Sequence, residues 1–248
     1  MILKKLTQQS KMLYLLTSGF SLISLVILAV STFTFPSAIT KFDFQKHLIS
    51  SFFATICLLG IMVGLFPSGC SRLLHFRDPN KGDKKIPLDQ ERTPFIQFLG
   101  HHPPCGNFST HILTVDGKTY CAGCTGLTVG AILSLLSVIF YVFSNIQVGE
   151  SNMLIFWIGF VAVAYGLLQY YLPGGNSGLL HVLVNGIFVF GAFLLLVGVH
   201  EIAGSFVLEV YLFMLMIYWI MTRIIASQLA HRHICAVCSK RCTYTEKL

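Results

Sequence analysis

Three cysteines and several histidines gather where a long polar segment meets an apolar run. Cys121 and Cys124 form a C-x-x-C pair at the start of that run, and Cys105 lies shortly upstream. Two thiolates at this spacing in a tight turn can coordinate one Zn²⁺, and two further ligands complete a tetrahedral site. We therefore predict a zinc site built from these three cysteines and one histidine. The candidate histidines, in order of preference, are His102, His111 and His101.

A second group of metal-binding residue types follows the last apolar run. Its members fall close together in the sequence and are His231, His233, Cys235, Cys238 and Cys242. Four of them can hold one metal ion, so two separate sites are the simplest interpretation. A shared site that interleaves ligands from both groups is an alternative. An iron-sulfur cluster held by four cysteines is another, because thiolates also suit such clusters.

The compartment decides the chemistry of these cysteines, because a reducing one favours metal ligation and an oxidising one favours disulfides. Of the 17 basic residues, all but Lys41 and Lys46 lie in the N-terminal segment, in residues 69–120, or in the final turns and tail. Basic residues accumulate on the cytosolic side of membrane proteins. We therefore expect a multi-pass protein of the cell membrane with both termini and both cysteine groups in the cytosol.

The elements that must position these groups are membrane helices. The chain has 248 residues, of which 54% are hydrophobic and 11% are charged, and its mean hydropathy is +0.73. A composition this apolar indicates that a lipid bilayer surrounds the protein, and nucleic acid is not expected as a partner despite the net charge of +7. Runs long enough to cross a bilayer, which takes about 20 helical residues, predict an all-α polytopic bundle of six spans. They cover residues 12–35, 47–68, 121–143, 152–172, 178–200 and 205–228.

These spans divide the chain into four parts. They are a first helical hairpin (1–68), a cytosolic Cys/His-rich loop (69–120), a four-helix membrane segment (121–230) and a cytosolic Cys/His-rich tail (231–248). The loop has too few apolar residues for a core of its own, and a bound metal would supply the missing constraint. Near the end of the loop, Asp116-Gly117 within an alternating run predicts a β-hairpin turn.

Polar and small residues also occur inside the spans. His181 and Asn185 lie one helical turn apart, and Gln169 is near the inner end of the fourth span. Hydrogen bonding between helices is the leading interpretation, and a small-substrate or proton site is the alternative. Close helix packing is expected along the third span at Gly123, Gly126 and Gly130. Near the external face we expect His47, His200 and Glu201.

Two stretches carry a resemblance to a known family. Gly100-His-His-Pro-Pro-Cys-Gly-Asn-Phe, followed by Tyr120-Cys-Ala-Gly-Cys-Thr-Gly-Leu at a helix start, resembles a family of uncharacterised prokaryotic, often archaeal, membrane proteins. In that family a Cys-His pair precedes a Phe-containing arm, and C-A-R-C-T-G then leads into a span. Here Gly123 takes the place of the Arg, and His-His-Pro-Pro-Cys takes the place of the first pair. The resemblance implies a shared local site and brings no established activity with it.

Three functions are compatible with these patterns. The first is a non-enzymatic membrane protein in which zinc orders loop and tail against the bundle, for docking of a cytosolic protein partner or for metal sensing. The second is a membrane thiol oxidoreductase that uses Cys121 and Cys124. The third is a small-solute transporter, for which His181 and Glu209 are the main ionisable groups within spans. No recognised catalytic motif is present, so the sequence leaves enzyme activity open, and it does not give the oligomeric state.

Overall fold

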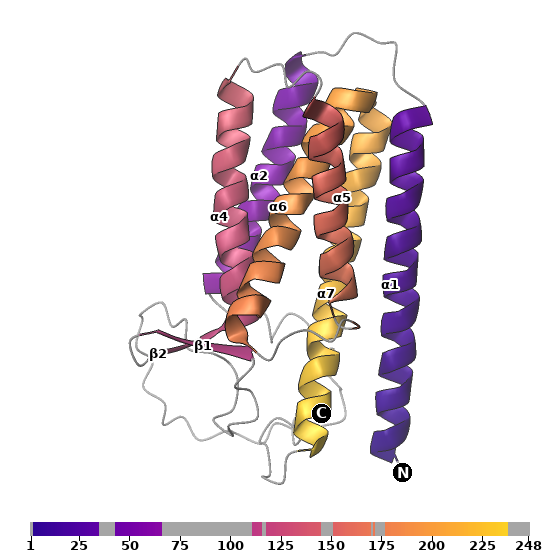
Figure 1. The fold of residues 1–248 in the computed structure, drawn as a ribbon, viewed down its shortest axis with the longest axis vertical. Helices are drawn as coiled ribbons and strands as arrows, with labels where there is room; N and C mark the ends of the chain where they lie inside the picture. The colour runs from indigo at the N-terminus through magenta and orange to yellow at the C-terminus, as the bar shows by residue number, and fades with distance from the viewer. Residues whose placement is uncertain are drawn as a thin grey trace, which may run out of the picture.

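The computed structural model describes residues 2–34, 43–65, 111–115, 118–144, 151–169, 171 and 177–237. The described residues form six helices and one two-stranded sheet, which lies at one end of the bundle (Figure 1). The elements are, in chain order, α1 (Ile2–Thr34), α2 (Asp43–Leu65), β1 (Ile112–Val115), β2 (Lys118–Cys121), α4 (Ala122–Phe143), α5 (Asn152–Leu168), α6 (Gly178–Ala203) and α7 (Phe206–Val237).

Consecutive helices run in alternating directions between the two ends of the bundle (Figure 1). The β-hairpin lies at the end where α1 begins and α7 finishes, which we call the hairpin end. The turn between α6 and α7 lies at the opposite end, which we call the far end. The start of α1 and the end of α7 therefore lie at the same end of the bundle, as an even number of spans requires.

Five of the described helices are long and apolar enough to cross a membrane: α1 from Met12, α2, α4, α6 and α7 up to Ser227. The remaining helix, α5, is apolar but has 17 residues. Its length of about 25 Å, at 1.5 Å per residue, is slightly less than a hydrocarbon core of about 30 Å. The prediction of an all-α polytopic bundle is confirmed.

Several helix ends differ from the predicted spans, and the largest difference is at the start of α1, which begins at Ile2 instead of residue 12. Helix α5 finishes at Leu168 instead of residue 172, because the chain turns there and the amide of Tyr171 donates to the carbonyl of Leu168 over 2.8 Å. Helix α7 continues to Val237, well beyond residue 228. The apolar run ends earlier, but no Gly or Pro between residues 206 and 237 interrupts the helix.

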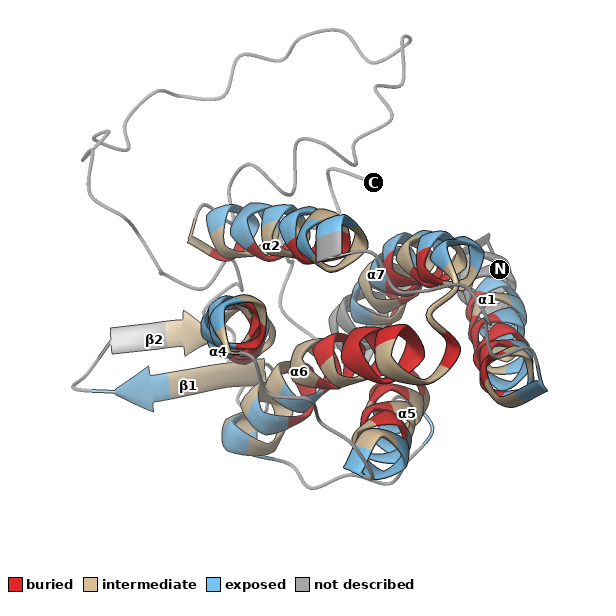
Figure 2. Cartoon of the chain, turned by 90° about the horizontal axis from the view of Figure 1, so that it is seen from above, coloured by how far each residue is buried: buried red, intermediate tan, exposed pale blue. Residues whose placement is uncertain are grey.

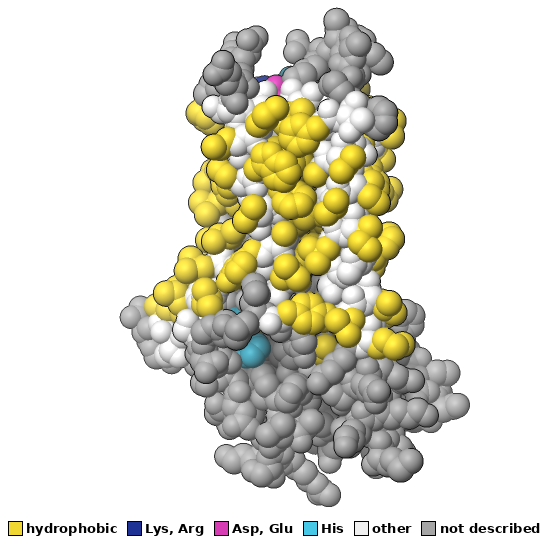
Figure 3. Space-filling view, turned by 45° about the vertical axis from the view of Figure 1, so that its right-hand side comes forward, with side chains coloured by type: hydrophobic (Ala, Val, Ile, Leu, Met, Phe, Trp, Pro, Cys, Tyr) yellow, Lys and Arg dark blue, Asp and Glu magenta, His cyan; other side chains and the backbone are white. Residues whose placement is uncertain are grey.

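The outer surface of the bundle is apolar. Hydrophobic side chains cover the described part of the bundle in the view of Figure 3, and exposed residues lie on the outward helix faces in Figure 2. Among them are Leu16, Val161 and Met214, each more than 60% exposed. A soluble monomer rarely presents so large an apolar area to water. These faces are suited to contact with lipid, so the protein is a membrane protein.

Helix α6 is the central element of the bundle (Figure 2). Helix α4 approaches it closely, since a Cβ on Gly130 would lie 2.7 Å from the carbonyl oxygen of Gly186, and one on Gly126 would be 2.8 Å from the Cβ of Asn185. The predicted packing role is confirmed for these two glycines. It is wrong for Gly123, because a Cβ there would meet, among the described atoms, only the sulfur of Cys121 at 3.9 Å.

Candidate functional site

The β-hairpin fixes the position of the C-x-x-C pair. Strands β1 and β2 are antiparallel, with Ile112 opposite Cys121 and Val115 opposite Lys118, so the predicted turn residues 116–117 connect them. Cys121 then serves as the N-cap of α4 with an extended backbone, φ −71° and ψ 116°. Cys124 follows in the first turn of the helix. A C-x-x-C pair at a helix start faces the positive end of the helix dipole, which favours thiolates.

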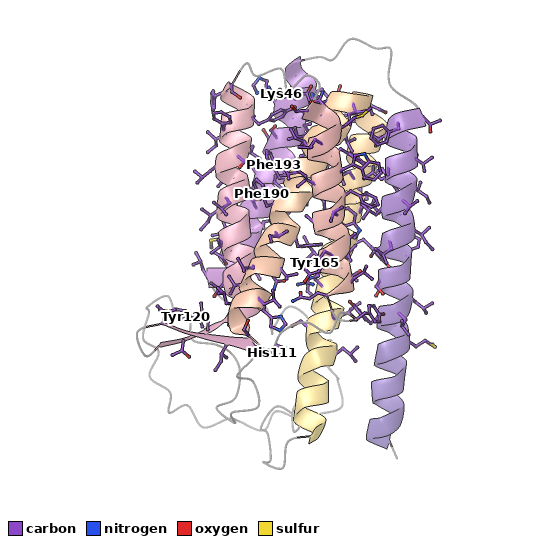
Figure 4. The ribbon with its side chains drawn as sticks, viewed as in Figure 1. Lys46, His111, Tyr120, Tyr165, Phe190 and Phe193 are labelled. Atoms are coloured by element: carbon purple, nitrogen blue, oxygen red, sulfur yellow. The ribbon has the colours of Figure 1, made fainter. Side chains whose placement is uncertain are left out.

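The hairpin is docked on the start of α6. A Cβ on Gly178 would overlap the carbonyl oxygen of Ile112, so only a glycine lets the strand approach this closely. Beside this contact the rings of His111 and His181 stack, with centroids 5.0 Å apart and planes inclined by 26°. Figure 4 shows His111 at the hairpin end, near the start of α6. His111, Cys121 and Cys124 are thus held at the same end of the bundle.

The described residues do not form a complete metal site. No three His, Cys, Asp or Glu side chains among them are close enough to hold a metal ion. His231, His233 and Cys235 belong to the last turns of α7, which finishes at the hairpin end. The other predicted ligands lie outside the described residues, and they are His101, His102, Cys105, Cys238 and Cys242.

A polar cluster inside the bundle lies next to the docked hairpin. It consists of Gln169, His181, Asn185 and Arg223, and we call it the arginine cluster. The guanidinium of Arg223 donates to the side-chain oxygen of Gln169 over 2.9 Å, to the side-chain oxygen of Asn185 and to the carbonyl oxygen of Gly166. These bonds join α7 to α6 and to the end of α5. The expected interhelical hydrogen bonding of Gln169 and Asn185 is confirmed.

The arginine cluster also determines which nitrogen of His181 carries the proton. The oxygen of the Gln169 amide faces Arg223, which can only donate, so the amide nitrogen faces Nδ1 of His181 at 2.9 Å. Because that nitrogen donates, Nδ1 must accept and the proton sits on Nε2. The amide of Asn185 is oriented in the same way, with its oxygen on Arg223 and its nitrogen donating to the carbonyl oxygen of His181 over 2.6 Å.

A second polar cluster lies at the far end. Nδ1 of His200 is 2.7 Å from a carboxylate oxygen of Glu209, and Gln45 donates to the other oxygen over 2.9 Å. Nearby, the hydroxyl of Tyr141 donates to Glu201 over 2.7 Å, and the ammonium group of Lys46 lies 4.3 Å from the centre of the Tyr141 ring. Figure 4 shows Lys46 at this end, with Phe190 and Phe193 between it and the hairpin end.

Sequence reasoning missed Arg223 as a bundle residue and missed the partners of Glu209. Arg223 was grouped with the basic residues of the tail, but the structure places it inside the bundle. Its position within an otherwise apolar run was the available signal. Glu209 was noticed as an ionisable residue, but its pairing with His200 was not predicted.

Comparison with protein-family models, with curated proteins and with solved structures finds no match to this chain.

Proposed function

We propose that this protein is an integral membrane protein in which a structural zinc ion orders the polar loop and tail against the hairpin end of the bundle. The observation that supports this proposal is the docked hairpin, which holds His111, Cys121 and Cys124 at the end where α7 also finishes. Cysteine thiolates and histidine imidazoles are donors that Zn²⁺ prefers, and the C-x-x-C pair would supply two of the four. The remaining ligands would come from the loop and tail groups, with Cys105 first among them.

On this proposal the hairpin end faces the cytosol. The distribution of Lys and Arg supports that orientation, and a reducing compartment keeps thiols available for a metal. Bound zinc would give the loop the order that its small number of apolar residues cannot provide. The ordered loop and tail would then present a fixed surface to a cytosolic protein, or would respond to the supply of metal.

The geometry gives less support to a transporter. Both polar clusters involve α6, but every residue of this helix from Gly186 to Val199 is apolar or glycine. A solute pathway needs polar groups between its two ends. A thiol oxidoreductase receives support from the position of Cys121 and Cys124 at a helix start, where the helix dipole favours thiolates.

Elemental analysis of three serine variants tests the zinc proposal. We expect Cys121→Ser and Cys124→Ser to lose bound zinc and to increase protease cleavage between Arg77 and Lys118, while all helices remain inserted. Cys57→Ser is the matched control, because Cys57 is buried in the apolar core of the bundle. If the two variants keep both metal content and loop protection, the proposal is wrong. Metal-free wild-type protein with a reversible Cys121–Cys124 disulfide would instead support the oxidoreductase.

A further inference from the structure

Arg223 places a positive charge inside the bundle without a carboxylate beside it. Its three hydrogen bonds go to neutral oxygens, those of Gly166, Gln169 and Asn185, and its Cζ lies 5.4 Å from the centre of the Phe188 ring. Within the part of the chain that the structure describes, no Asp or Glu forms an ion pair with it. An intramembrane charge is costly, and such residues commonly mark a ligand site or pathway.

Arg223 and His181 have N–H groups beyond those used in their hydrogen bonds to described residues. A guanidinium has five N–H groups, and the bonds that Arg223 makes to described residues use three of them. The Nε2 proton of His181 is a further donor, because Nδ1 accepts from Gln169. The side-chain oxygens of Gln169 and Asn185 are already occupied by Arg223.

A ligand that suits this environment is negatively charged and accepts hydrogen bonds. The location favours phosphate, because Arg223 lies four residues before Ser227, where the apolar part of α7 ends. That is about 6 Å from the end of the span, close to the level of lipid headgroups. Guanidinium groups bind phosphate oxygens through paired N–H donors. We infer that the arginine cluster binds a phosphate group, supplied by a lipid headgroup or by free phosphate, with Arg223 and His181 as donors.

This inference does not depend on the zinc site, and binding to the full-length protein in a phosphate-free detergent tests it. Three probes separate the sources: phosphatidylglycerol, inorganic phosphate, and diacylglycerol as a lipid that lacks phosphate. We expect phosphatidylglycerol or inorganic phosphate to raise the melting temperature, and diacylglycerol to leave it unchanged. An effect of the lipid alone identifies a headgroup, whereas an effect of inorganic phosphate identifies a soluble ligand. Native mass spectrometry counts the retained lipid.

Substitutions at Arg223 test whether the phosphate probes bind at the arginine cluster. Arg223→Gln should lower the affinity for whichever phosphate probe binds the wild type by about tenfold or more, as expected for loss of a charge-assisted hydrogen bond. Arg232→Gln is the matched control, because it removes the same charge from the same helix beyond the span, and it should bind like the wild type. If Arg223→Gln does not fold, Arg223→Lys takes its place, since it removes the paired guanidinium donors and preserves most of the side-chain length. Equal binding by wild type and these variants, or no response of the wild type to either phosphate probe, would overturn the inference.

Discussion

His200 and Glu209 form a buried pair across the turn that joins α6 to α7. Their side chains are 3% and 0% exposed, and Nδ1 of His200 lies 2.7 Å from Oε1 of Glu209. Gly204, between them in the chain, adopts a left-handed φ of 58° that ends α6 and lets the chain reverse. Because Gln45 donates to the second oxygen of Glu209, one carboxylate joins α2, α6 and α7. Its removal should therefore loosen three helices together.

The stability losses of the two single variants of this pair should add up to more than the loss in the double variant. Glu209→Ala is expected to cost about 3 kcal/mol, because the donors of His200 and Gln45 are left unsatisfied in a buried place. His200→Ala should cost a similar amount. The double variant should lose less than the sum by about 1 kcal/mol or more, since it removes both partners. Denaturant unfolding in detergent micelles measures all three values.

A local hydrogen bond on α2 supplies the control for the two single variants and the double variant. The hydroxyl of Ser51 donates to the carbonyl oxygen of His47 on an exposed face of α2, so Ser51→Ala should change stability by only about 0.5 kcal/mol or less. Strict additivity of the His200 and Glu209 substitutions would show that the two side chains are not energetically coupled.

The contact between α4 and α6 predicts a contrast between two glycines. Gly130→Ala should destabilise the bundle by about 1 to 3 kcal/mol, because its Cβ would lie 2.7 Å from the backbone of Gly186 and helices would have to separate. Gly19→Ala is the control, since a Cβ there meets no described atom within 4 Å. It should be neutral or slightly stabilising. Thermal unfolding of the two variants side by side checks the difference, and equal melting temperatures would contradict the close approach.

The sequence predicted features that depend on local pattern. Apolar run length located all six described helices, because crossing a bilayer requires a minimum number of apolar residues. Asp116-Gly117 predicted the hairpin, since few dipeptides suit a two-residue turn. The spacing of Gly126 and Gly130 predicted a close helix contact. Each of these signals lies within a short stretch of chain.

The partners in the two polar clusters could not be predicted in this way. Arg223 binds side chains that precede it by 38 and 54 positions, and Gln45 and Glu209 are 164 positions apart. Such pairs depend on which helix faces become neighbours, and the apolar pattern of a lipid-facing helix does not specify its partner. Polar residues in spans indicated that inward contacts exist, but only the packed bundle shows which residues meet.

Docking of the hairpin on α6 predicts a sensitive position at Gly178. Gly178→Ala should displace the hairpin, because the added Cβ would overlap the carbonyl oxygen of Ile112 and neither backbone can yield easily. Hydrogen exchange of the amides in 112–121 should then increase severalfold, while α6 stays protected. Gly123→Ala is the matched control near the same cysteines, with only an ordinary contact to the sulfur of Cys121 at 3.9 Å. Unchanged exchange in Gly178→Ala would contradict the docked arrangement.

The last prediction concerns the orientation of the bundle. Ser144 ends α4 at the far end, whereas position 239 follows α7, which finishes at the hairpin end. Lys41 and Lys46 are the only basic residues in the predicted external segments, and the other basic residues belong to the segments predicted at the hairpin end. The hairpin end should therefore face the cytosol. A membrane-impermeant maleimide reagent of high mass should therefore label Ser144→Cys in intact cells, and Ser239→Cys only after the membrane is opened. Each added thiol is counted as a gel shift relative to the parent chain, whose own cysteines set the baseline. Labelling of Ser239→Cys in intact cells with none at Ser144→Cys would reverse the orientation and would place the cysteine groups in an oxidising compartment.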